Sequence, residues 1–309
     1  MALLGALTLG VGMTLKDRIK IRVETWEASA RPWAGRGRLN SLLFEFVIFG
    51  LKQAWASLFG AAMLLLLITT HLFWPAHAPV ARYDALVVAA ILIQAFMLAS
   101  RLEQPSEALV IVIFHIVGTV MEVFKTAHGS WIYPEASVLR IGGVPLFSGF
   151  MYACIGSYIA RVMRLMDIRY ERFPPFWAPW LLALLSYANF FTHHYMPDMR
   201  LGLFAVSLLI WGRTWVIFTP DVKARRMPLI LSALLVALFI WVAENLGTFA
   251  SAWVYPTQRH AWSIVPIAKI GSWYLLVTLS FVLVTIVRRP RMAGVAIGPA
   301  RAPSLYGPL

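Results

Sequence analysis

The chain has 309 residues, of which 60% are hydrophobic and 13% are charged, and its formal net charge is +13. Soluble globular domains contain about 25% charged residues, so this composition excludes that class and predicts a polytopic membrane protein. The basic residues fall in alternate loops between apolar stretches and do not line one surface. The positive-inside rule explains this distribution, and we expect no nucleic-acid partner.

About eight membrane-spanning helices are predicted, in an all-α bundle, because a helix needs roughly 20 apolar residues to cross the hydrocarbon core. In chain order the predicted spans are 45–70, 84–100, 108–125, 143–163, 176–191, 200–218, 228–249 and 263–287. Basic residues precede the first span and follow the fourth, sixth and eighth, which places both termini in the cytoplasm. We therefore predict a multi-pass protein of the cell (inner) membrane, with the loops around Trp131, His193 and Trp253 on the outer side.

A block of polar and aromatic residues occurs twice at a constant offset. The motif E-x3-T-x4-W-x-Y-P begins at Glu122 and again at Glu244 (244 − 122 = 122), and THLFWP at 70–75 matches THHYMP at 192–197 with the same offset. Two motifs that agree on one offset indicate an internal duplication. Four helices per half is an even number, so the halves would be parallel and related by an axis along the membrane normal.

This duplication divides the chain into four predicted parts. They are a cytoplasmic basic N-terminal segment 1–40, a first four-helix repeat 41–165, a second four-helix repeat 166–290 and a flexible cytoplasmic tail 291–309.

Glu122 and Glu244 each lie near the outer end of an otherwise apolar span. A carboxylate there costs roughly 3 kcal/mol unless it is paired, hydrated or protonated, and so indicates a functional site. A protonated carboxyl group in a dry site could donate a proton to a double bond or an epoxide, or relay protons in a transporter. We take both glutamates as candidate catalytic residues, together with Lys125 and Lys269, which could pair with them. The structural alternative is that each glutamate hydrogen-bonds to the Trp and Tyr of its own W-x-Y-P turn.

The aromatic residues of the two motifs, Trp131, Tyr133, Trp253 and Tyr255, have two interpretations. They fit an interfacial aromatic belt, which has no catalytic role. They could also line a substrate pocket for a flat or polyunsaturated lipid and stabilise positive charge with their ring faces.

Histidines in the THLFWP and THHYMP motifs are candidate ligands of a metal site. His193, His194 and Asp198 lie in NFFTHHYMPD, and His71 occupies the matching place in the first repeat. The histidine spacings of helical zinc sites and membrane di-iron enzymes are absent, so such a site would have to be assembled in space, with iron as the candidate ion. No fingerprint of a nucleotide cofactor is present.

Several segments resemble a known family. They are FGLKQAWASLFG, FHIVGTVMEVFKTAHGSWIYPE, GGVPLFSGFMYACIGSY, NFFTHHYMPDMR, IWVAENLGTFASAWVYP and AKIGSWYLL. Over roughly residues 41 to 290 they are similar to the YoaT-like bacterial membrane family of unknown function, which implies an integral membrane protein and supplies no activity. A fainter similarity runs to carotenoid hydratases and heterodimeric-type lycopene cyclases. It depends on Glu122, Gly129, Trp131, Tyr133 and Gly143 to Leu146, with Glu244, Trp253 and Tyr255 as the second copy.

The leading functional hypothesis is an integral membrane enzyme of hydratase, cyclase or oxygenase type. It would modify an isoprenoid, carotenoid or acyl lipid between the two repeats, so its partners would be membrane lipids or a hydrophobic small molecule. The alternative is a proton-coupled transporter or permease, favoured by the duplication and the carboxylates. Transporters have helices broken near the midplane, whereas Pro145 and Pro266 lie near outer helix ends. A structural factor without a ligand would be favoured if side chains filled the space between the repeats.

Overall fold

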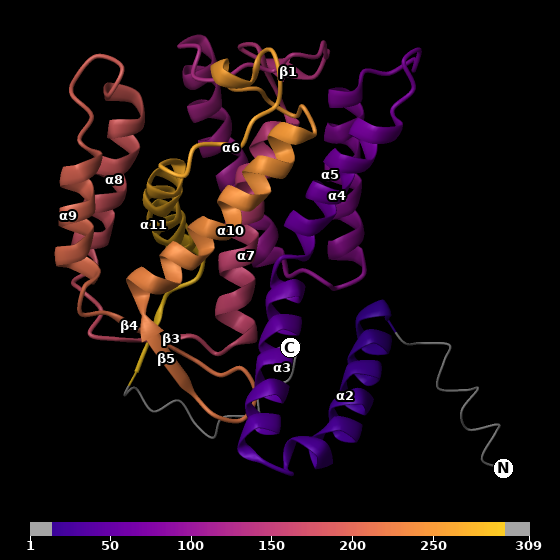
Figure 1. Cartoon of the computed structure of the whole chain (residues 1–309), viewed down its shortest axis with the longest axis vertical. Helices are drawn as coiled ribbons and strands as arrows, with labels where there is room; N and C mark the ends of the chain where they lie inside the picture. Colours follow the sequence, from indigo (N-terminus) through magenta and orange to yellow (C-terminus); the bar gives the residue numbers. More distant parts are fainter. Residues whose placement is uncertain (1–13, 294–309) are drawn as a thin grey trace.

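The computed structural model describes residues 14–293, which form a mostly helical bundle with two small β-sheets (Figure 1). Its helices are α2 Leu15–Ala34, α3 Arg38–Ala56, α4 Leu58–Phe73, α5 Arg82–Ala99, α6 Pro105–Ala127, α7 Phe147–Leu165, α8 Trp177–Thr192, α9 Arg200–Trp211, α10 Leu229–Phe249 and α11 Lys269–Val287, with a short 3-10 turn at Pro256–Gln258. The predicted segment 1–40 contains α2 and the start of α3, and its first 13 residues lie outside the described residues. The predicted tail is also outside them from residue 294 onward.

The sheets, which the sequence did not predict, lie at opposite ends of the bundle (Figure 1). Strands β1 (Arg140–Ile141) and β2 (Val144–Pro145) form an antiparallel hairpin in the loop between α6 and α7. The second sheet has the order β5-β4-β3-β6, with β6 parallel to β3 and the other pairs antiparallel. Its strands are β3 Arg169–Glu171, β4 Trp215–Phe218, β5 Arg225–Pro228 and β6 Arg291–Met292.

Four helices of the described chain, α5, α6, α10 and α11, are long and apolar enough to cross a membrane. Helices α3 and α4 would form a fifth span if they act as one, although they are bent by 68° at Ser57. The chain is therefore a membrane protein with four to five candidate spans, fewer than the eight predicted.

The remaining predicted spans are helical but differ from the prediction for physical reasons. Helix α7 has 19 residues, is mostly buried and carries the buried Arg161 and Arg164 in place of a continuous apolar surface. Helices α8 and α9 have 16 and 12 residues. At 1.5 Å per residue they extend roughly 24 and 18 Å, which is less than the hydrocarbon core of about 30 Å. The predicted span 200–218 ends early because the chain leaves α9 and forms strand β4.

Helices α6 and α7 pack closely because glycines on each helix leave room for large side chains of the other helix. A Cβ atom on Gly118 of α6 would lie 2.8 Å from the Tyr152 ring of α7, and one on Gly156 of α7 would lie 2.7 Å from the Phe114 ring of α6. At the other end of this pair, Arg161 lies 3.1 Å from Glu103 in a buried ion pair. These contacts fix α6 against α7 and bring Tyr152 close to the last turns of α6.

The ends of α6 are specified by its sequence. Pro105 occupies the first turn, and Gln104 and Glu107 form a capping box at the N-terminus. The helix ends at Ala127, and Gly129 follows with φ +67°, a left-handed conformation that glycine adopts without strain. This turn reverses the chain, so the W-x-Y-P segment runs back toward Glu122.

Candidate functional site

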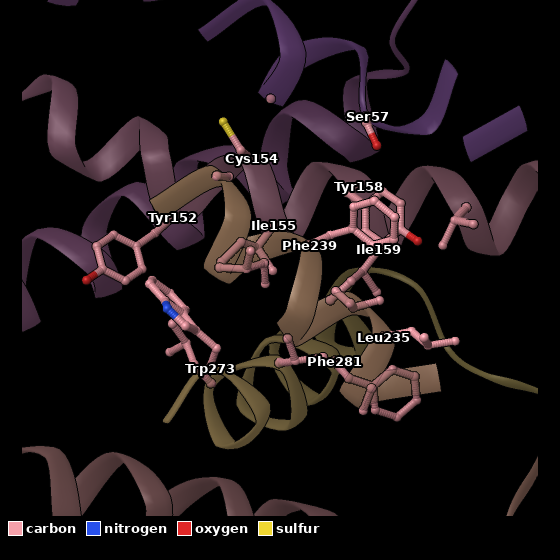
Figure 2. A pocket seen from close by; sticks show the side chains of 18 of the residues that line it. Ser57, Tyr152, Cys154, Ile155, Tyr158, Ile159, Leu235, Phe239, Trp273 and Phe281 are labelled. Carbon is pink, nitrogen blue, oxygen red and sulfur yellow. The ribbon is translucent and has the colours of Figure 1, made fainter. Parts of the chain in front are cut away.

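A cavity of about 910 Å³ lies between α3, α4, α7, α10 and α11. Its wall is mostly apolar, and its charged lining residues are Glu122, Glu244 and Lys269. The four predicted pocket residues, Trp131, Tyr133, Trp253 and Tyr255, all line it. Figure 2 shows Tyr152 and Trp273 on one side of this space and Tyr158, Leu235 and Phe281 on the other. The volume is within the range of pockets that bind small molecules, and side chains do not fill the space.

Glu122 is buried and accepts hydrogen bonds from neutral donors. The indole of Trp131 donates to Oε2 over 2.7 Å, the hydroxyl of Tyr133 donates to the same oxygen over 2.6 Å, and the hydroxyl of Tyr152 donates to Oε1 over 2.5 Å. The structural interpretation, in which Glu122 binds its own Trp and Tyr, is therefore correct for the first motif. The third donor comes from α7.

Glu244 has a similar but not identical environment. The hydroxyl of Tyr255 donates to Oε1, and the indole of Trp273 in α11 donates to Oε2 over 2.6 Å. Trp253 is not a partner, because its ring packs on Gly247, where a Cβ atom would lie 2.5 Å from the ring. The matching residue in the first motif is Lys125 (247 − 122 = 125), whose long side chain leaves no room for such packing.

The two W-x-Y-P turns pair with each other. Ile132 and Val254, which occupy equivalent positions (254 − 132 = 122), form an antiparallel bridge in which each N–H donates to the other's carbonyl over 2.9 Å. The Trp131 and Tyr255 rings meet edge to face with centroids 6.0 Å apart. This bridge places the two glutamate sites side by side at one end of the cavity.

The two lysines have different surroundings, and neither forms an ion pair with Glu122 or Glu244 in residues 14–293. The ammonium of Lys269 lies 4.3 Å from the ring centroid of Tyr255 and 5.8 Å from that of Trp131. The ammonium of Lys125 lies 3.1 Å from Nε2 of His193 and 3.2 Å from Nε2 of His194. Lys269 therefore belongs to the cavity wall, and Lys125 to a neighbouring cluster of histidines.

The four predicted metal ligands do not form one cluster, although His193 and His194 lie together with ring centroids 4.2 Å apart. His71 packs against Phe249, with ring centroids 5.8 Å apart, and Asp198 is paired with Arg200 over 2.5 Å. The part of the chain that the structure describes contains no group of three His, Cys, Asp or Glu side chains that could hold a metal ion. His193 and His194 are bound to a lysine, so these residues do not fit an iron site.

Tyr152 and Trp273 were missed in the sequence, although a signal for them existed. Val144 and Pro145 recur as Val265 and Pro266, at an offset of 121 and not 122, because the second loop is one residue shorter. The same offset relates Tyr152 to Trp273 (273 − 152 = 121). Following the repeat through this one-residue deletion would have identified both donors.

Comparisons with known proteins identify relatives but no activity. A family model described as "Protein of unknown function (DUF817)" matches residues 45–281, which include both glutamates. The chain is 42% identical over 240 residues to the uncharacterized protein YoaT of Bacillus subtilis (strain 168), covering 78% of this chain and 90% of that protein. No solved structure matches the chain.

Proposed function

The chain belongs to the DUF817 family of proteins of unknown function, and we propose that it is an integral membrane enzyme that modifies a hydrophobic substrate by acid/base chemistry. The family resemblance seen in the sequence is thereby confirmed, while the likeness to carotenoid hydratases and lycopene cyclases stays a prediction. The observation that carries the proposal is that Glu122 and Glu244 both line the same apolar cavity of about 910 Å³. An isoprenoid, a carotenoid or an acyl lipid would fill such a space.

The surroundings of the two glutamates favour different roles. Glu122 is buried and has no cationic partner within residues 14–293, so it would be the acid that gives a proton to an alkene carbon. Positive charge would develop on the neighbouring carbon, where the faces of aromatic rings can stabilise it. Water would form a bond to that carbon and pass its extra proton to Glu244, whose donor Tyr255 also lies against the ammonium of Lys269. Return of that proton from Glu244 to Glu122 would restore both groups for the next turnover. The result is addition of water, as in a hydratase.

The predicted number and arrangement of the membrane spans are part of the same proposal. Eight spans in a parallel four-plus-four arrangement would require the buried α7 and the peripheral α8 and α9 to complete crossings as well (Figure 1). The pairing of equivalent residues Ile132 and Val254 supports the duplication. So does a left-handed residue at the same place after α6 and α10, Gly129 and Ser251 (251 − 129 = 122). With both termini in the cytoplasm, the glutamates would face the outer leaflet of the cell membrane.

Lipid mass spectrometry on a deletion strain tests the enzymatic proposal. The strain is complemented with the wild-type chain, with Glu122→Gln, with Glu244→Gln or with Glu24→Gln, the last a control on the exposed surface of α2. In wild type and in the control we expect a lipid whose mass exceeds that of its precursor by one water molecule. In either cavity variant the amount of this lipid should fall by about a hundredfold. A lipidome that is the same in all strains with equal protein levels would contradict enzymatic activity.

A proton-coupled transporter is the second candidate, favoured by one observation. Helices α3 and α4 are bent by 68° at Ser57, and Ser57 lines the cavity. Interrupted helices beside a binding site are typical of transporters. Proton uptake into proteoliposomes that depends on Glu122 and Glu244, combined with an unchanged lipidome, would favour this candidate over the enzyme.

A further inference from the structure

Lys125 is a buried cation that contacts two imidazole rings. It lies in the last turn of α6 and is 4% exposed. Its ammonium donates to His193 and His194, and the other ring nitrogen of His193 donates to the carbonyl of Asn189 over 2.8 Å. An ammonium has three donors, so one has no hydrogen-bond acceptor among residues 14–293. Within residues 14–293 it forms no ion pair, and Asp198, which attracts it electrostatically, is already paired with Arg200.

This lysine adjoins the polar end of the cavity. Met121 and Glu122, one turn earlier on α6, line the cavity. So does Phe190, whose ring centroid lies 5.6 Å from the Lys125 ammonium. The ammonium of Lys125 therefore lies beside a ring that lines the cavity.

Two further cations gather at the same end. Lys269 is part of the cavity wall, and Arg200, which is exposed and paired with Asp198, donates to the hydroxyl of Ser272, another lining residue, over 3.1 Å. Lys125 is repelled most strongly by Lys269, which forms no ion pair within residues 14–293. Two like charges that are at least partly buried destabilise one another, and an anion that binds between them removes this cost. We call these residues the basic cluster: Lys125, His193, His194, Arg200 and Lys269.

We propose that the basic cluster binds the anionic head group, a phosphate or a carboxylate, of an amphiphile whose apolar chain lies in the cavity. This inference deepens the proposed function and depends on it, because it names the substrate class. Lysine ammonium groups are common phosphate ligands, and the remaining donor of Lys125 is suited to an oxygen of such a group. The substrate would then be an acyl lipid or a phosphorylated isoprenoid, and an uncharged carotenoid would be disfavoured.

Binding to the purified full-length chain in lipid nanodiscs tests the proposal without requiring turnover. The probes are hexadecyl phosphate, hexadecanol and inorganic phosphate. We expect hexadecyl phosphate to bind wild type at least about tenfold more tightly than hexadecanol, as one charge-assisted hydrogen bond would give. Lys125→Gln should remove most of this preference and leave hexadecanol binding unchanged, whereas Lys125→Arg should retain it. Lys223→Gln, which removes an exposed charge from the loop between β4 and β5, serves as the matched control.

Equal affinity of wild type for the two amphiphiles would overturn the proposal, and this comparison needs no variant to fold. Inorganic phosphate that binds as tightly as hexadecyl phosphate would overturn it too, since the site would then serve a soluble anion. A clear preference for the phosphate amphiphile, lost in Lys125→Gln, supports the head-group site even if the lipidome of the deletion strain does not change. An unchanged lipidome would contradict only the enzymatic function.

Discussion

At the scale of single residues, the hydrogen bonds of Glu122 define its chemistry. Tyr152 donates to one carboxyl oxygen over 2.5 Å, whereas Trp131 and Tyr133 share the other oxygen. Since Tyr152 belongs to α7 and the other two donors belong to the loop after α6, the carboxyl group joins two elements. Its orientation toward the cavity therefore depends on the Tyr152 hydroxyl.

A double-mutant cycle between Tyr152→Phe and Glu122→Gln measures this contact. We expect a coupling of about 1 kcal/mol in the free energy of unfolding, the usual size of such a bond inside a membrane protein. The control is Tyr158→Phe, because the Tyr158 hydroxyl donates to Gln53 over 2.8 Å and shares no partner with Glu122. The effects of Tyr158→Phe and Glu122→Gln on the free energy of unfolding should be additive. If the coupling of Tyr152→Phe to Glu122→Gln is no larger than that of Tyr158→Phe, the Tyr152–Glu122 hydrogen bond does not form.

At the scale of elements, the site depends on how closely α6 approaches α7. A methyl group added at Gly118 would meet the Tyr152 ring at 2.8 Å, so either the ring or the helix has to move. Gly118→Ala should therefore lower the free energy of unfolding by about 1–3 kcal/mol, as overpacked cores do.

Gly50→Ala is the matched control for this prediction. Gly50 is also helical, in α3, but no atom lies within 4 Å of an added Cβ atom. Alanine has a higher helix propensity than glycine, so this variant should be unchanged or more stable by up to about 1 kcal/mol. Thermal unfolding of the two variants in detergent provides the comparison. Equal melting temperatures would contradict close packing of α6 on α7.

The elements also show how far the sequence predicts the fold. Predicted spans 84–100, 108–125, 228–249 and 263–287 match α5, α6, α10 and α11, because each of these helices contains an apolar stretch long enough to cross a membrane. Hydropathy could not reveal the bend at Ser57 or the interior position of α7, since both depend on tertiary packing. The repeat motif identified the glutamates and their aromatic neighbours from sequence. It could not identify the partners of Lys125, because a long side chain can reach several groups from one backbone position.

At the scale of the whole molecule, the two ends of the bundle hold different elements. One end holds the W-x-Y-P turns and the β1–β2 hairpin, and the other holds the four-stranded sheet and α2 (Figure 1). Arg31 of α2 pairs with Asp221 over 2.8 Å, and Arg225 pairs with Glu45 over 2.5 Å, so α2 and α3 are attached to the β4–β5 hairpin. Helix α2 and strand β6, which pairs with β3, therefore lie at the same end of the bundle.

Labelling of single cysteines in right-side-out membrane vesicles tests the orientation that this arrangement predicts. Cys154 is the one cysteine of the chain and is replaced by alanine. Cysteine is then introduced at Val138, which is 86% exposed near the W-x-Y-P turns, or at the exposed Lys223 beside the four-stranded sheet. Because basic residues are retained on the cytoplasmic side, an impermeant maleimide should label Val138→Cys in intact vesicles and Lys223→Cys only after permeabilisation. The reverse pattern would place the glutamates at the cytoplasmic leaflet, and labelling of both positions in intact vesicles would contradict a bundle that spans the membrane between them.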